Sequence, residues 1–234
     1  MLIASVIFSL LEAPLFEVRS VNVSGNARTS EELVLDTLAV PEDQALLLTD
    51  TEAGEAALGA LPWVRDVEIS RQWPSTLQVV IRERGVAASI GRPDGSEWLV
   101  VSEDGFVVER RATPPAAVPL IVGTDPMVAT ARIGEPVEEA ERALEIALDI
   151  PRQLDPWITT WTLTADGMLT AELVGSARAN FGTFEDSRTQ FVSLASILNG
   201  GAELTCLDLI DLSVADTPVL HRNAECIVQS AELG

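Results

Sequence analysis

Residues 61–84 read LPWVRDVEISRQWPSTLQVVIRER, and this stretch decides the fold of the N-terminal part of the chain. Apolar residues alternate with polar ones in 67–70 and again in 77–82, which is typical of strands with one buried face. Trp73-Pro74 separates the two segments, and Pro74 favours an extended residue before it and a turn around it. The stretch therefore predicts two consecutive strands joined by a turn.

The residues before this stretch predict one more strand and two short helices. Alternation over 18–23 indicates a strand, which ends at a Ser-Gly-Asn turn. Thr29 and Glu32 match a capping box with Thr29 as the N-cap, and Thr49 and Glu52 match a second one. The predicted order over about seventy residues is strand, helix, helix, strand, strand.

From residue 85 onward the pattern changes to short strands separated by Asp-Gly and other turns. Two helices interrupt these strands. One begins at Gly134-Glu135-Pro136, with Pro136 near its first turn, and the other covers Phe191 to Leu198. Together these elements predict an α+β chain, in which an antiparallel-sheet domain with two flanking helices (85–234) follows the first domain.

The chain is strongly acidic, because 36 Asp and Glu residues stand against 15 basic residues, all of them Arg. The formal net charge of −21 would repel phosphate backbones. Nucleic-acid binding is therefore not expected, nor is docking on anionic lipid through a basic patch.

The first eleven residues, MLIASVIFSLL, carry no charge. A helix that spans a bilayer needs about 20 apolar residues, so this run is too short to cross alone. It also lacks the basic residues that precede the core of a signal peptide. A buried strand or helix is one interpretation. We favour the other, in which residues 1–15 are the C-terminal remnant of a membrane anchor.

The chain has two cysteines, Cys206 and Cys226. If the chain is extracytoplasmic, as an anchor implies, an even pair favours a disulfide. Two buried free thiols are the alternative.

The residue types required for catalysis are sparse. His221 is the single histidine, and its place beside Arg222 in a terminal strand favours a surface position over a general base. Cys206, His221 and Cys226 are the only soft candidate metal ligands and lack a Cys-x-x-Cys pair. A carboxylate pair for hydrolysis could be hidden among the many acids, although nothing selects one. We expect no enzymatic activity, cofactor or metal. Trp63 and Trp73 are expected at the edges of the core, rather than on a sugar-binding platform.

Several motifs make residues 16–84 resemble a POTRA domain of the type found in FtsQ/DivIB cell-division proteins. The resemblance is carried by four segments: Phe16–Asn26 leading into Thr29–Glu32, the Pro-Trp-Val of 61–67, the Trp-Pro-x-x-Leu of 71–77, and Arg82–Arg84. Weaker similarity to the family's second domain continues at Ser102–Gly105, Pro119–Gly123, Phe181-Gly182 and Ile210–Ser213. Gly85 departs from the pattern, since the family often has Pro there.

The resemblance implies a bitopic scaffold of the bacterial divisome that binds FtsB- and FtsL-type proteins outside the cytoplasm, at the septum, and links them to septal peptidoglycan synthases. By motif, the implied partner-binding residues are Arg188, Asp211, Leu212, Ser213, Val214, Val219 and Leu220. Residues 214–218 are the expected edge segment for strand addition, and Val64–Arg71 is a second candidate contact surface. The alternatives are an extracytoplasmic adaptor with a different partner and a carboxylate-dependent secreted hydrolase.

Overall fold

The computed structural model describes residues 16–41, 43–116, 118–123, 125–137, 141–183, 187–201, 203–214 and 216–223. The chain divides into two compact units, Met1–Gly85 and Val86–Gly234. Met1 to Leu11, predicted as part of an anchor, lie outside the described residues. Among the residues that are described, no helix is long and apolar enough to span a membrane.

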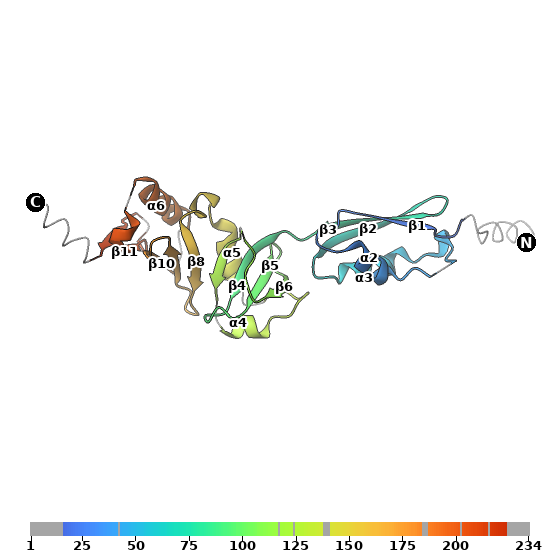
Figure 1. The fold of residues 1–234 in the computed structure, drawn as a ribbon, viewed down its shortest axis with the longest axis horizontal. Helices are drawn as coiled ribbons and strands as arrows, with labels where there is room; N and C mark the ends of the chain where they lie inside the picture. The colour runs from blue at the N-terminus through green and yellow to red at the C-terminus, as the bar shows by residue number, and fades with distance from the viewer. Residues whose placement is uncertain are drawn as a thin grey trace, which may run out of the picture. The chain divides into compact units, whose positions relative to one another are not determined.

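The first unit is a three-stranded sheet with helices on one side (Figure 1). Its elements, in chain order, are β1 (Ser20–Ser24), α2 (Glu31–Leu38), the 3-10 turn η2 (Leu46–Leu48), α3 (Thr51–Gly59), β2 (Val64–Gln72) and β3 (Thr76–Glu83). The predicted order of strand, helix, helix, strand, strand is confirmed. β3 is central, pairing in parallel with β1 and antiparallel with β2.

Both predicted helix caps are wrong by one residue. The N-cap of α2 is Ser30, whose Oγ accepts a hydrogen bond from the Leu33 N–H at 3.2 Å. The neighbouring Thr29 instead donates its backbone N–H to Glu83. The N-cap of α3 is Asp50, which accepts from the Ala53 N–H at 3.0 Å, while Thr49 donates its hydroxyl to the Ala45 carbonyl. In each case the residue after the threonine, which is also a good cap, takes the N-cap position.

The core of the first unit draws on both helices, the 3-10 turn and the sheet. Its buried members are Val34, Leu46, Leu58, Val64, Ile69, Leu77, Val79 and Ile81. They include the alternating residues of β2 and β3, because successive side chains of a strand point to opposite faces of the sheet. The expectation that Trp73 lies at the core edge is wrong, since 52% of this residue is exposed in the turn between β2 and β3.

The second unit contains a nine-stranded sheet of order β12-β11-β10-β9-β8-β7-β4-β5-β6. The strands, in chain order, are β4 (Val86–Gly91), β5 (Trp98–Ser102), β6 (Val107–Arg111), β7 (Leu120–Val122), β8 (Ile158–Leu163), β9 (Leu169–Leu173), β10 (Arg178–Gly182), β11 (Leu207–Asp211) and β12 (Val219–Arg222). Its helices are α4 (Asp125–Thr130), α5 (Glu141–Asp149) and α6 (Ser187–Asn199). The predicted α+β class is confirmed.

Most neighbouring strands of this sheet run antiparallel, as expected, but three pairs are parallel. These are β4 with β7, β7 with β8, and β10 with β11. Each pair arises where the strands are not joined by a tight turn. The connection from β10 to β11, for example, contains α6, and a crossover of this kind permits parallel pairing.

Pro136 does not occupy the first turn of a helix, contrary to expectation. It forms an isolated bridge with Phe106, and the next residue, Val137, donates its N–H to the Gly105 carbonyl at 3.1 Å. The helix itself, α5, is described from Glu141. Pairing with the hairpin that precedes β6 therefore outweighs the local preference of Pro for a helix start.

An aromatic cluster joins α6 to the sheet. Phe191 of α6 lies 5.9 Å from Trp161 of β8 and 5.6 Å from Phe181 of β10, between ring centroids, and all three side chains are buried. Edge-to-face pairs of this kind contribute about 0.5–1.5 kcal/mol beyond the area that they bury. The cluster holds α6 against β8 and β10, and β10 is the strand that pairs with β11.

Candidate protein-interaction edge

The two edges of the nine-stranded sheet differ in how far other segments cover them. At β6, Val107 donates its N–H to the Glu135 carbonyl at 3.0 Å and accepts from the Gly134 N–H at 2.8 Å. The guanidinium of Arg110 also donates to the carbonyls of Val128 and Ala131. Segments that follow β6 thus occupy its outer side.

Within the described residues, β12 is the open edge. It pairs with β11 alone, and no segment within the described part of the chain pairs with its outer side. All four of its residues are exposed, including Val219 and Leu220. An edge strand with free backbone groups and apolar side chains is a template for the addition of another strand.

The predicted partner-binding residues fall into two groups by exposure. Val219 and Leu220 lie on β12, and Ser213 and Val214 lie in the connection that leads to it, with all four exposed. Leu212 is fully buried, so it supports the edge from inside and offers no surface to a partner.

The expectation that residues 214–218 form the edge segment is wrong, because the residues described there, 214 and 216–218, lie in the turn between β11 and β12. The Thr217 N–H is donated to the Val214 carbonyl at 3.0 Å, which closes a tight turn. The edge strand proper begins one residue later, at Val219.

Asp211 closes the C-terminal end of β11. Its carboxylate accepts a hydrogen bond from the Ser213 N–H at 2.9 Å. Hydrogen bonds from the Ser213 hydroxyl and N–H, together with the nearby His221, hold the pKa of Asp211 below its usual value despite partial burial. Asp211 faces Val219 across the strand pair, so the ionised side chain stabilises the turn beside the open edge.

Two features that the sequence did not reveal hold the β10–β11 end in place. Gln190 of α6 is buried, and its Nε2 donates to the carbonyls of Phe181 and Leu212, each at 2.8 Å. Gly182 adopts φ +63°, and a Cβ built on it would lie 3.1 Å from the Cβ of Ser213. The available signals in the sequence were the glycine that ends β10 and a glutamine within a helix, but neither signal identifies the residues that it contacts.

Arg188 lies on the opposite face of α6 from Gln190, two residues away, and is exposed. The sheet-facing side of the helix is formed by Phe191, Leu194 and Leu198. Arg188 is therefore an exposed side chain of α6 and does not contribute to the core.

The second predicted surface, Val64–Arg71, lies on β2, which is an edge strand of the first unit. This edge is covered in part by its own unit. The Ile69 N–H is donated to the Glu55 carboxylate at 2.8 Å, and the Arg71 guanidinium donates to the carbonyls of Leu46 and Thr49. β12 is thus the more open of the two predicted edges.

Comparison with known proteins finds a family model for the first unit and several similar cell division proteins. The model of the POTRA domain, FtsQ-type, matches residues 16–84. The cell division protein FtsQ of Rhizobium meliloti is 36% identical over 117 residues, which are 50% of this chain and 37% of that protein. FtsQ of Agrobacterium fabrum is 38% identical over 111 residues, 47% of this chain and 34% of that protein. The cell division protein DivIB of Clostridium botulinum is 24% identical over 110 residues, 47% of this chain and 42% of that protein.

The chain is similar to FtsQ and DivIB cell division proteins over about half of its length. Its first unit is the FtsQ-type POTRA domain that the sequence motifs predicted. The matched regions span less than half the length of each of these three relatives.

The two cysteines of the chain are described only in part. Cys206 is disulfide-bonded, and its carbonyl accepts the Asn223 N–H at 2.9 Å. Cys226 lies outside the described residues, so its pairing with Cys206 stays a prediction. Such a bond would tie the segment after β12 to the residue before β11.

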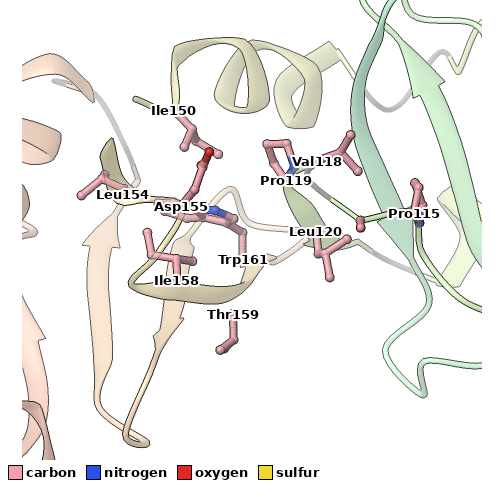
Figure 2. A pocket seen from close by; sticks show the side chains of 11 residues that line it. Pro115, Val118, Pro119, Leu120, Ile150, Leu154, Asp155, Ile158, Thr159 and Trp161 are labelled. Carbon is pink, nitrogen blue, oxygen red and sulfur yellow. The ribbon is translucent and has the colours of Figure 1, made fainter. Parts of the chain in front are cut away.

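A cavity of about 340 Å³ lies in the second unit and is mostly apolar. Figure 2 shows Trp161 between Pro119 and Leu120 on one side and Leu154 and Ile158 on the other. Asp155 is its single ionisable lining residue. Among the described residues that line it, the cavity therefore offers apolar contacts and one carboxylate.

Proposed function

We propose that this chain is a non-enzymatic scaffold of the bacterial divisome that binds FtsB- and FtsL-type proteins outside the cytoplasm. It would be held at the septal membrane by a single-pass N-terminal anchor and would link these partners to septal peptidoglycan synthases. The match of residues 16–84 to the FtsQ-type POTRA domain and the similarity to FtsQ proteins support a role in cell division. The observation that carries the proposed binding mode is the open edge at β12.

Binding by strand addition suits this edge. A partner segment in extended conformation would satisfy the free backbone groups of β12, while Val219 and Leu220 would supply apolar contacts. The buried Leu212 and the hydrogen bonds of Gln190 keep the neighbouring strand in place before the partner arrives. Preorganisation of this kind lowers the entropic cost of association. Arg188 would add a charged contact from α6.

The substitution Val219→Asp tests this binding mode. A charge on an edge strand opposes pairing with a further strand. Loss of an apolar contact at the centre of an interface costs about 2 kcal/mol, or roughly thirtyfold in affinity. We expect the variant to lose retention of FtsB- and FtsL-type proteins when the full chain is used to capture them from detergent-solubilised membranes of the source bacterium.

Val174→Asp is a matched control, because Val174 is 49% exposed and Val219 is 48% exposed, while Val174 follows β9 and lies outside β12. Equal capture by the wild type and both variants would contradict the use of β12. Capture of other proteins in place of the FtsB and FtsL types would support an adaptor with a different partner.

A further inference from the structure

The two ends of the POTRA sheet are set by strand register. Ser20 of β1 and Gln72 of β2 both face Thr76 of β3, so these three residues mark one end. Glu83 of β3, which faces Val64 of β2, marks the other. The chain enters β1 at the first end, while β3 leads out of the unit at the second.

The first end gathers apolar side chains from three separate segments. Phe16 forms an edge-to-face pair with Trp73 in the β2–β3 turn, with ring centroids 5.8 Å apart. Glu17, next to Phe16, forms an isolated bridge with Ala45, and this brings the 3-10 turn of Leu47 and Leu48 to the same end. We name Phe16, Leu47, Leu48 and Trp73 the N-terminal apolar surface.

This surface is exposed to an unusual degree for its residue types. Trp73 is 52% exposed, Leu48 is 60% and Leu47 is 43%. At the opposite end of the same unit, the ring of Trp63 is covered by the guanidinium of Arg28, whose carbon lies 4.4 Å from the ring centroid. Clustered exposed apolar side chains mark an interaction site, whereas single ones do not.

The position of the surface indicates what covers it. Phe16 is one of its members, and the sequence that runs directly into it, residues 1–15, is apolar with Glu12 as its single charge. If this segment is anchored in a bilayer, as the proposed function holds, the surface lies at the boundary between headgroups and acyl chains. Trp is enriched at this boundary because its ring is apolar and its N–H is polar, and Leu side chains insert just below it.

The charges near this surface indicate how it would contact a bilayer. The three segments that form this end carry three acids, Glu17, Asp43 and Asp50, and two basic residues, Arg19 and Arg71. A surface of this kind carries no excess of positive charge that would attract anionic lipid. Attachment must therefore rely on insertion of apolar side chains, and it should depend little on salt.

We propose that the N-terminal apolar surface inserts into the headgroup boundary of the bilayer, with Trp73 as its deepest aromatic side chain, and so orients the POTRA domain on the membrane. The inference rests on the membrane tether of the proposed function and adds a second, non-covalent contact to it. It also gives a reason for the exposure of Trp73, which packing in the core does not explain.

Quenching by brominated lipid tests this proposal. The full chain is incorporated into vesicles of phosphatidylcholine, with or without brominated acyl chains, and vesicle association is measured by flotation. Brominated lipid is expected to reduce tryptophan emission of the wild type. This loss should largely disappear in Trp73→Phe, which keeps an aromatic ring beside Phe16, and should persist in high salt. Trp63→Phe, a matched change at the opposite end of the same unit, should be quenched as the wild type is.

The outcomes separate the two proposals. Vesicle association with equal quenching of the wild type and Trp73→Phe would overturn the insertion of Trp73 and leave the tether intact. Absence of vesicle association would overturn both the tether and this inference. Quenching that Trp63→Phe abolishes would place the opposite end of the unit on the membrane and overturn the assignment.

Discussion

Glu83 joins the last strand of the POTRA domain to the loop before α2. Its carboxylate accepts hydrogen bonds from the N–H groups of Ala27, Arg28 and Thr29, at distances between 2.7 and 3.0 Å. Burial alone would raise the pKa of Glu83, but the hydrogen bonds from Thr29, Arg28 and Ala27 outweigh it and hold the pKa below its usual value. One charged side chain thus satisfies three consecutive backbone donors that no helix or sheet uses.

At this residue scale we predict that Glu83→Gln lowers the free energy of unfolding of the POTRA domain by about 1–2 kcal/mol at pH 7, because hydrogen bonds to a charged acceptor are stronger than those to a neutral one. Because the pKa of Glu83 is lower in the folded state than its unfolded value of 4.5, ionised Glu83 stabilises the folded domain at pH values above 4.5. This stabilisation is lost as the pH falls through the pKa of the folded state. The difference between wild type and variant should therefore shrink in acid. Urea unfolding at a series of pH values measures it.

Glu68→Gln serves as the control, since Glu68 is an exposed residue of β2 in the same domain. A variant Glu83→Gln as stable as Glu68→Gln at pH 7 would show that the three N–H contacts add no net stability.

At the scale of elements, α6 connects two strands that are far apart along the chain. The amide of Gln190 reaches Phe181 at the end of β10 and Leu212 just after β11, and the Leu212 N–H is donated to the Asn180 carbonyl at 2.7 Å. The parallel β10–β11 pair therefore has a side-chain brace at the end that leads to the proposed binding edge.

Gln190→Met keeps the size of the side chain but removes both donors. Loss of two buried hydrogen bonds is expected to cost about 2 kcal/mol. It should also speed hydrogen exchange at the Leu212 amide, which mass spectrometry of exchanged peptides can detect. Gln153→Met, at an exposed position, controls for the chemical change. Unchanged exchange around Leu212 would argue against the brace.

At the scale of the whole molecule, the chain builds two separate hydrophobic cores. One contains residues from Val34 to Ile81 and the other contains residues from Ala88 to Leu212, with no member in common. A stable core on each side of Gly85 is what independently folding units require.

We predict that Leu46→Ala, in the first core, lowers the stability of the POTRA domain by about 2–5 kcal/mol through the cavity that it leaves. Exchange of amides in Val86–Gly234 should stay unchanged. Leu169→Ala, at an equally buried site in the second core, should show the reverse pattern. If either substitution accelerates exchange throughout the chain, the two units unfold as one.

Patterns that are local in sequence predicted the POTRA domain well. The alternation around Trp73-Pro74 and the turn before Thr29 lie within a few residues of the strands that they delimit, so the element order follows from short-range preferences. The same preferences misplaced the caps. Thr29 and Ser30 are both suitable N-caps, so local sequence does not decide between them, and Ser30 is the cap in the structure.

The candidate site depended much more on long-range pairing. Local sequence was enough to predict strands around Ile210 and Leu220, and family motifs pointed to the same region. Local sequence could not show that β12 is the last described strand of the sheet, or that Gly134 and Glu135 cover the opposite edge at Val107. Hydrogen bonds between strands join residues that are distant in the chain, and the pattern of one strand does not encode its neighbour. Element type in this protein therefore follows from local sequence, while the position of its open edge follows from the order in which the strands pair.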